Sequence, residues 1–386
     1  MKTFLESRHT NSESNVKLLS IFVFLPAVLD VEKWRRDFAI GMVPDESPYG
    51  YHHAVAEGFD LSFSKPFKSK TIVEKFLCRI SNKLFKFDIV HAWRNRKSMF
   101  ASDVIWTHTE HEHLAVELLA FVLQKKINLI AQSVWLIDEW PNLSALHRRF
   151  YQFLMQRAGV LTFLSKNNLN VAEKIMPGKD SRLIPFGISF DSFPAIAISS
   201  IIFHLPLRVL VLGNDRHRDW LTLFNAFAGK STFEVKIASQ TFPKTLRADN
   251  FSLVHASQKE LINLYSWADI IIIPLTENLH ASGITVILEA VALGVPCIAT
   301  DTGGLKDYFS NQEITYVPSG DAGALFDAAM NLKANPKQAW EMAMRAQKHL
   351  QFKNYSSKKY TQMHCTISRE LIALNPSENL EKIQAR

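Results

Sequence analysis

Glu289 is the side chain in this sequence that most clearly points to chemistry. It is the only charged residue in the apolar run 284–299, and Ser282-Gly283 precede that run directly. A Ser-Gly pair can turn tightly, and the helix expected after it brings a positive dipole end and unpaired N–H groups to the turn, which favours an anion. A carboxylate about two turns into the helix can accept hydrogen bonds from two vicinal hydroxyls, as a ribose presents. The pattern predicts that Glu289 faces a nucleotide.

A second group of candidate residues follows the strand expected at 207–213. Asn214, Arg216 and Arg218 come directly after it. Ligands of open parallel sheets bind outside the carboxyl ends of the strands, so this position makes both arginines candidates for a binding site. The alternative is that they are ordinary surface charges of a basic protein.

Histidines and glutamates gather at residues 108–113, where a strand is expected to end and a helix to begin. We expect no metal there, because no H-E-x-x-H spacing occurs and histidines at i, i+3 and i+5 do not share one helix face. Helix capping and solvation account for most of these side chains. His108, nearest the strand end, is the candidate catalytic residue, which orients an acceptor hydroxyl or touches a donor sugar. Asp138 and Glu139, after the next strand, compete for this role.

Apolar segments alternate with segments of helical periodicity, and these elements must position the candidate residues. Such alternation is typical of parallel sheets covered on both faces. It pauses at 194–206, a stretch with a proline at each end and no Asp, Glu, Lys or Arg, which suits a linker. The pattern predicts two doubly wound α/β domains, with strands at 17–24, 59–64, 87–93, 103–109, 128–136, 159–165 and 181–188 in the first, and a second series that begins at 207–213.

Composition agrees with two folded domains. A chain of 386 residues exceeds what one core usually covers, and 47% hydrophobic against 21% charged residues describes an ordinary folded protein. Lys and Arg outnumber Asp and Glu by 44 to 37, which favours anionic partners. The three cysteines show no CxxC spacing, so a reducing cytosol is expected. The apolar run 18–29 falls short of the roughly 20 residues of a bilayer span.

The run from "ADIIIIPL" through "ASGITVILEAVALGVPCIATDTGGLKDYF" resembles the donor-site signature of the retaining glycosyltransferases of family four. "RAGVLTFLSKNNLNVAEKI", "LIPFGISFDSF" and "LGNDRHRDWLTLFNAF" resemble other parts of that family in the same order. The resemblance implies the GT-B fold, in which two Rossmann-like domains face each other. It also implies a nucleotide-diphosphate sugar donor and no cofactor.

The resemblance assigns roles to individual residues. Glu289 matches the second glutamate of the family's E-x7-E pattern, which holds the ribose, and the amides of Gly283, Ile284 and Thr285, next to Ser282, match the turn that contacts sugar and phosphates. Arg218 matches the lysine that neutralises the diphosphate. Asn214 stands where the family places an arginine, for which Arg216 is a substitute. The first glutamate falls on Ala281, a departure near which Glu277 and His280 offer other polar groups.

Residues 65–86 have the pattern of a basic amphipathic helix. Apolar residues recur at helical spacing, while Lys75, Arg79 and Lys83 form an i, i+4 row on another face. Such a helix can lie on an anionic membrane. The alternative is a helix whose apolar face packs on the sheet while its lysine face is solvated, and both can hold together.

The sequence thus predicts a retaining glycosyltransferase that acts on a lipid-linked or polysaccharide acceptor, cytoplasmic or peripheral on the inner face of the membrane. We expect an acceptor domain at 1–195, a linker at 196–206, a donor domain at 207–354, and a helix at about 355–386 that returns to the first domain. A catalytically idle binding protein, suggested by Ala281, and a nucleotide-sugar epimerase are the alternatives. A dehydrogenase and a nucleic-acid binder are disfavoured, because neither G-x-G-x-x-G nor a recognition motif occurs.

Overall fold

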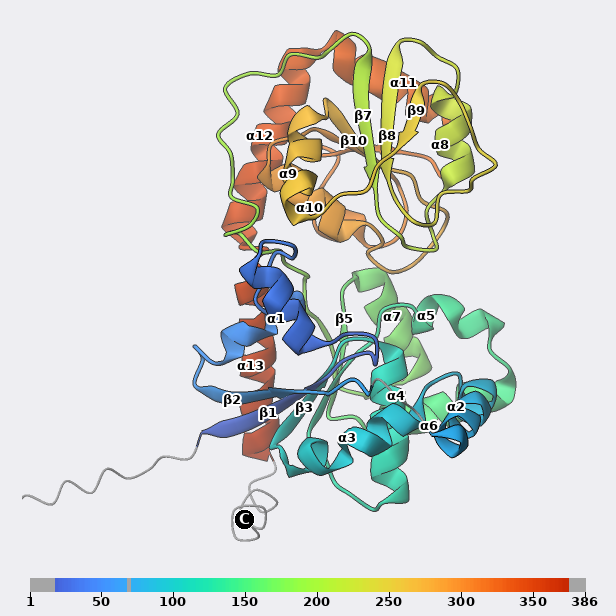
Figure 1. Ribbon diagram of the computed structural model, residues 1–386, viewed down its shortest axis with the longest axis vertical. Helices are drawn as coiled ribbons and strands as arrows, with labels where there is room; N and C mark the ends of the chain where they lie inside the picture. Colours follow the sequence, from blue (N-terminus) through green and yellow to red (C-terminus); the bar gives the residue numbers. More distant parts are fainter. Residues whose placement is uncertain (1–17, 68–70, 375–386) are drawn as a thin grey trace, which may run out of the picture.

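Two parallel sheets, one in each half of the chain, organise the protein. The computed structural model describes residues 18–67 and 71–374. The first sheet has the strand order β2-β1-β3-β4-β5-β6 and the second β12-β11-β10-β7-β8-β9. Every strand pairing in both sheets is parallel. Figure 1 shows the two halves one above the other, each with helices around its sheet.

The first half is built from short, buried strands: β1 (Leu19–Phe24), β2 (Phe59–Phe63), β3 (Val104–Thr107), β4 (Leu129–Gln132), β5 (Val160–Phe163) and β6 (Ser181–Leu183). Its helices are α1 (Val31–Ala39), η1 (Pro48–Ala54), α2 (Ile72–Phe85), α3 (Ile89–Ala101), α4 (Glu110–Val122), α5 (Leu136–Glu139), η2 (Trp140–Asn142), α6 (Ala145–Arg157) and α7 (Lys166–Ile175). Helices α3, α4, α6 and α7 share one core with the sheet, so they cover the same face. The central strands β3, β4 and β5 are buried throughout, as expected for strands covered on both faces.

The second half repeats this plan. Its strands are β7 (Leu207–Leu212), β8 (Phe233–Ala238), β9 (Phe251–Leu253), β10 (Ile270–Ile273), β11 (Cys297–Thr300) and β12 (Thr315–Val317). Its helices are α8 (Trp220–Phe227), α9 (Gln258–Trp267), α10 (Ile284–Ala292), η3 (Leu305–Asp307), α11 (Ala322–Ala334) and α12 (Pro336–Lys353). One core joins α9, α10 and α12 to the sheet, and another joins α8, α11 and α12 to it. Both faces are therefore covered.

The chain crosses between the halves twice. Residues 194–204 form the first crossing and contain no helix or strand. At the second crossing α12 ends and α13 (Ser357–Leu374) returns to the first half, where it shares a core with β1, β3, η1 and α1. The crossings lie together, because Ile188 N donates to Tyr355 O at 3.1 Å and Ser357 N donates to Ile188 O at 2.8 Å. Figure 1 shows α12 and α13 along one side of the molecule.

The fold class predicted from the sequence is confirmed, but the strand expected at 87–93 is wrong. Residues 89–101 form helix α3 instead, and Asp88 starts it by accepting from the N–H groups of Val90 and His91. The β-branched start of "FDIVHAW" favours a strand locally, whereas this cap satisfies two N–H groups that a helix start otherwise leaves unpaired. Within the described residues, no helix is both long and apolar enough to cross a membrane.

Helix α2 forms where helical spacing predicts it, with a capping box of Thr71 and Glu74 at its start. Residues 68–70 of the expected segment lie outside the described residues. The helix rests on the protein through the small side chains of Cys78 and Ser81. Its large apolar side chains face outward, with exposed fractions from 37% to 86%: Ile72, Val73, Phe76, Leu77, Ile80 and Leu84. The interpretation that this apolar face packs on the protein is therefore wrong.

Candidate functional site

Glu289 lies inside the second half, on helix α10. Gly283 starts this helix with a φ of 79°, a left-handed conformation that a residue with a side chain rarely adopts. The Glu289 side chain is buried, and its Oε2 accepts a hydrogen bond of 2.7 Å from the Tyr265 hydroxyl. Burial raises the pKa of Glu289 to about 7, although the Tyr265 hydrogen bond acts in the opposite direction.

Glu289 lines a cavity of about 620 Å³ at the carboxyl ends of β7 and β8. Asn214 lines it too and holds the loop after β8, because its Oδ1 accepts from Gln240 N at 2.7 Å and from Ser239 Oγ at 3.1 Å. The remaining lining residues come mainly from the loops after β7, β8 and β9 and from the start of α9, and Met42 comes from the first half. The cavity volume suits a small organic ligand, and Glu289 supplies an acceptor in its wall.

Arg218 lies beside this cavity and is the most unusual charged residue of the second half. Its side chain is buried, and its Nε and Nη1 have no hydrogen-bond partner among the described residues. A Cβ at Gly283 would stand 2.8 Å from Arg218 Nη1, and one at Gly213 would overlap Nη2. Burial lowers the pKa of Arg218 to about 10, so the side chain remains cationic near neutral pH. A buried cation with unused donors, closely flanked by two glycines, is suited to an anion.

The other residues predicted at the turn before α10 differ in burial. Ser282 is buried and its hydroxyl has no partner in the described part of the chain, Ile284 is buried in the core, and Thr285 is exposed. Ala281 packs in the same core as Ile284. Glu277 accepts instead from the Thr302 hydroxyl at 3.2 Å.

Arg216 points away from Arg218, toward the first half. Its Nη1 lies 2.9 Å from Glu139 Oε1, and its guanidinium lies 5.9 Å from the centre of the Trp135 ring. All three residues line a second cavity, of about 400 Å³, together with residues that include Lys86, Glu110, Tyr151 and Asp215. The cavity lies between the halves. The structure therefore does not bring the two arginines to one place.

His108 is enclosed in the first half. The Tyr49 ring stacks on it at 3.3 Å between centroids, and its Nδ1 lies 3.0 Å from the Tyr51 hydroxyl. Burial lowers the pKa of His108 to about 3, so the imidazole is neutral. His108 lines neither the 620 Å³ nor the 400 Å³ cavity.

Glu110, Glu112 and His113 are buried too, whereas His111 is exposed. The expectation that most of these side chains cap the helix or solvate the protein is therefore wrong for solvation. Glu110 Oε2 accepts from the N–H groups of Val134 and Trp135, at 3.0 and 3.2 Å, and so fixes the loop after β4. Glu112 accepts from the Thr109 hydroxyl, and burial raises its pKa to about 7. His113 lies fully in the core.

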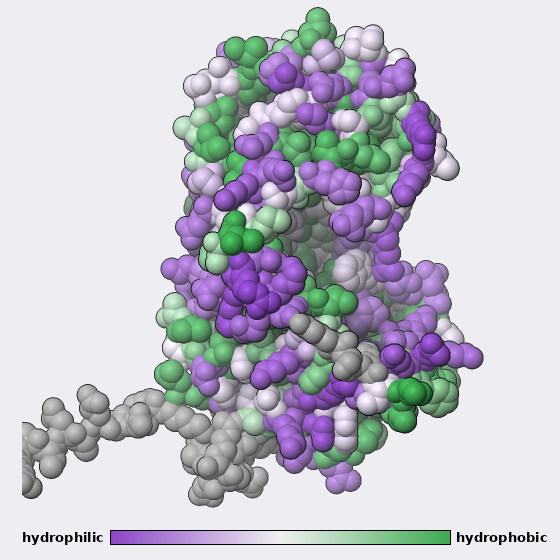
Figure 2. All heavy atoms as spheres, in the orientation of Figure 1, coloured by the Kyte–Doolittle hydropathy of each residue, from purple (hydrophilic) through white to green (hydrophobic). Residues whose placement is uncertain are grey.

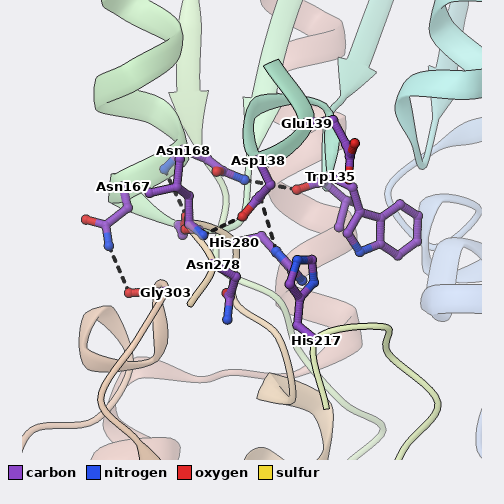
Figure 3. Close-up of polar contacts among 12 residues, drawn as sticks. Trp135, Asp138, Glu139, Asn167, Asn168, His217, Asn278, His280 and Gly303 are labelled. Carbon is purple, nitrogen blue, oxygen red and sulfur yellow. Dashed lines mark hydrogen bonds and ion pairs between the residues drawn. The ribbon is translucent and has the colours of Figure 1, made fainter. Parts of the chain in front are cut away.

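Sequence reasoning missed a bridge between the halves centred on His280. Its Nδ1 lies 3.2 Å from Asp138 Oδ2 in the first half, and its Nε2 lies 3.3 Å from Asp215 Oδ2 in the second. Burial lowers the pKa of His280, but the two carboxylates outweigh burial and raise it to about 9. Figure 3 shows His280 between Asp138 and His217 at the meeting of the halves. The residues are distant in sequence, and only the short D-x-H spacing at 215–217 could have drawn attention to them.

Comparisons with known proteins concern the family and the fold of the chain. Residues 223–349 match the family model "Glycosyl transferases group 1", about a third of the chain. By sequence, no curated protein matches. Among solved structures, sucrose-phosphate synthase from Thermosynechococcus elongatus aligns with a TM-score of 0.65 and 15% identity over 92% of this chain and 100% of that one.

Two further solved structures are similar over most of their length. HepE of Anabaena in complex with UDP has a TM-score of 0.62 and 11% identity, and the alignment covers 90% of this chain and 99% of that one. An α,α-trehalose-phosphate synthase (UDP-forming) from Burkholderia vietnamiensis has a TM-score of 0.61 and 10% identity over 92% and 99%. At such identities the likeness establishes the fold. The chain therefore has the two-domain GT-B fold, and its residues 223–349 match the group 1 glycosyltransferase model.

Proposed function

We propose that the protein transfers a sugar from a nucleotide-diphosphate sugar to an acceptor. The observation that carries this proposal is Arg218, a buried cation with two unused donors between Gly213 and Gly283. A diphosphate supplies the acceptors that this guanidinium lacks. The 620 Å³ cavity next to it holds the nucleoside, and Glu289 accepts from the two ribose hydroxyls there.

Arg218 then contributes to the chemical step as well as to binding. When the bond between the sugar and the diphosphate breaks, negative charge grows on the diphosphate oxygens. A buried guanidinium that is already in place stabilises this charge without reorganising solvent, and the growing charge strengthens the interaction in the transition state. We include retention of configuration in the proposal because the donor-site sequence resembles retaining enzymes. In that chemistry the leaving diphosphate takes the acceptor proton, and His108 has no part in it.

The base of the donor is uracil in this proposal. Solved structures of HepE, which shares the fold, contain UDP or UDP-glucose. Uridine nucleotides are therefore the first to test.

The exposed surface of helix α2 supports the proposal that the acceptor is held at a membrane. Its six outward apolar side chains are hydrophobic surface that a protein in water normally buries. Lys75, Arg79 and Lys83 are exposed alongside them, which gives the pattern of a helix that inserts its apolar face among acyl chains while its cations meet anionic headgroups. Figure 2 shows apolar and hydrophilic side chains side by side at the lower right, where α2 lies in Figure 1.

The position of α2 connects this surface to the active site in our proposal. Lys86 ends the helix in a left-handed conformation and also lines the 400 Å³ cavity between the halves. An acceptor anchored in the membrane under α2 would reach the cleft along this path. We therefore propose a lipid-linked acceptor whose polar head enters the 400 Å³ cavity.

The test begins with thermal unfolding in the presence of UDP, GDP and ADP and of their sugars, since a ligand that binds only the folded state raises the melting temperature. We expect UDP and a UDP-sugar to stabilise the protein. Slow release of sugar to water, without acceptor, then separates a working enzyme from a protein that only binds the donor. Conversion of the donor to its epimer would identify an epimerase. Absence of a shift with all nucleotides would contradict the proposal.

A further inference from the structure

Asp215, His217 and His280 present one ligand atom each within 4.8 Å of one another. Asp215 and His217 lie in the loop after β7, and His280 lies in the loop between β10 and α10. The His217 amide donates to Asp215 Oδ1 at 2.8 Å, which holds the carboxylate in the loop. Two rings and a carboxylate from separate loops thus converge where the two halves meet (Figure 3).

The separations within this group are those of long hydrogen bonds and also those of ligands around an ion. His280 Nε2 lies 3.3 Å from Asp215 Oδ2, and His217 Nδ1 lies 3.2 Å from Asp215 Oδ1. Charge-assisted hydrogen bonds are usually about 2.7–2.9 Å. Tetrahedral zinc with bonds of about 2.0–2.1 Å places neighbouring ligand atoms about 3.3–3.4 Å apart.

Asp138 completes the arrangement from the opposite half. Its Oδ2 lies 3.2 Å from His280 Nδ1, while its Oδ1 accepts from Leu279 N at 2.5 Å. The side chains of His280 and Asp138 are only 3% and 6% exposed. A carboxylate behind a histidine fixes the ring so that the other nitrogen faces a metal, an arrangement typical of zinc sites.

We propose that Asp215, His217 and His280 bind a divalent transition-metal ion, Zn²⁺ in the first place, with Asp138 as the carboxylate that orients His280. Two imidazoles and a carboxylate suit zinc better than magnesium or calcium. The ion's charge balances the two carboxylates. Asp215 lines the 400 Å³ cavity, so the remaining coordination position is open to an oxygen of a ligand there. This inference does not depend on the proposed function.

Isothermal titration of untagged protein, freed of metal by chelator and dialysis, with Zn²⁺ alone tests the site. We expect one ion per chain in the parent. His217→Ala and Asp215→Asn should lose this binding, and Asp138→Asn should weaken it by roughly 10- to 100-fold. Cobalt in place of zinc should give visible absorption bands that His217→Ala abolishes.

The double variant His52→Ala/His53→Ala is the matched control, because Asp45, His52 and His53 form a second group of potential ligands. It should bind Zn²⁺ as the parent does. Each variant must unfold at the parent's temperature without metal. His217→Ala is the main variant because the His217 side chain is 17% exposed, against 3% for His280. Zinc binding that survives His217→Ala, or no stoichiometric binding by the parent, would overturn the site and leave His280 as a protonated bridge. Since no nucleotide is present, failure of the donor proposal would not affect this result.

Discussion

A buried arginine without a carboxylate partner lowers the stability of the folded protein. Arg218 keeps two unpaired nitrogens inside the second half, among the described residues, although leaving a buried charged donor unpaired costs more than about 1–3 kcal/mol. Residues that lower stability in this way are typical of functional sites, where activity requires groups that packing alone would not select. The cost itself is therefore evidence that Arg218 serves a ligand.

Arg218→Met should separate the effect of Arg218 on stability from its effect on ligand binding. The variant keeps most of the apolar stem and removes the buried charge, so we expect an unchanged or higher melting temperature. Affinity for UDP should fall about 10- to 100-fold, while affinity for uridine stays within about 2-fold, because only UDP carries the diphosphate. Arg208→Met is the control, because Arg208 lies on strand β7, before the loop that carries Arg218, and is paired with His204 and Trp267. This variant should bind both ligands normally. Equal losses for UDP and uridine would argue against a diphosphate role.

Glu289→Gln should weaken uridine binding by about 1.5–3 kcal/mol, the worth of a hydrogen bond to a charged group. The pKa of about 7 adds a dependence on pH. The ionised carboxylate accepts from both ribose hydroxyls, so the parent's affinity for uridine should rise as the pH increases through 7. Calorimetry at pH 6 and pH 8 should show this rise in the parent and not in Glu289→Gln. A parent profile as flat as the variant's would exclude the carboxylate as the ribose ligand.

The carboxyl group of Glu289 should also make the stability of the protein depend on pH. Its pKa in the folded protein lies above the ordinary value of 4.5, so between pH 4.5 and 7 the native state holds more protons than the unfolded chain. The free energy of unfolding contributed by Glu289 is therefore fully present below pH 4.5 and is lost as the pH rises through 7. Urea unfolding of the free protein should show that Glu289→Gln loses less stability than the parent between pH 5 and pH 8. Parallel pH profiles would contradict the raised pKa.

At the scale of elements, α2 is the segment on which the proposed membrane contact rests. Changing Lys75, Arg79 and Lys83 to Glu should abolish cosedimentation with anionic vesicles, since each cation near such a surface contributes about 1 kcal/mol. Binding by the parent should also weaken as salt rises, because charge is screened over about 8 Å at physiological ionic strength. Sugar release from the donor should survive, because the donor site is assigned to the other half.

Reversal of Lys337, Lys348 and Lys353 on α12 is the control for net charge, because these lysines are also exposed but lie on the second half. This variant should sediment with the vesicles as the parent does. If the apolar face of α2 instead meets a second copy of the chain, analytical ultracentrifugation will show a dimer that Phe76→Ser and Ile80→Ser dissociate. That outcome, or vesicle binding by the α2 variant, would refute membrane docking.

The local elements show what sequence alone could predict. Apolar runs such as 270–273 become buried strands because nothing in them favours another structure. The strand predicted at 87–93 is wrong because a single capping residue, Asp88, outweighs the strand-like composition of the segment. The helix at 72–85 was predictable from spacing, but spacing does not tell which side of it meets the protein. Local sequence patterns were enough to predict Glu289 and Arg218 as candidates. The bridge of Asp138, His280 and Asp215 forms only after both halves have folded and met, so no local pattern predicts it.

At the scale of the whole molecule, the halves meet through very close backbone contacts. A Cβ at Gly304 would overlap Ser165 of the opposite half, although the φ of −95° at Gly304 suits any residue. Gly304→Ala should therefore push the halves apart without straining its own backbone. We expect faster limited proteolysis of residues 194–204 and slower sugar transfer, with the melting temperature changed little.

Gly323→Ala is the matched control for this substitution. Gly323 lies in α11, where an added Cβ meets only Asp321 Oδ1 at 3.3 Å. Alanine favours a helix by about 1 kcal/mol over glycine, so this variant should be slightly stabilised and fully active. Transfer by Gly304→Ala at the parent's rate would show that the contact with Ser165 does not control how the halves meet.

The return of α13 to the first sheet has a consequence for the order in which the protein is made. The ribosome finishes the strands of the first half at residue 183, but the helix that covers one face of them ends only at residue 374. At about 5–20 residues per second, this delay of 191 residues lasts roughly 10–40 s. During this time the second half is completed, while the first half lacks α13 on the face that it shares with α1 and η1. The half that is synthesised first is therefore finished last, and it is the half that a chaperone on the nascent chain would have to protect.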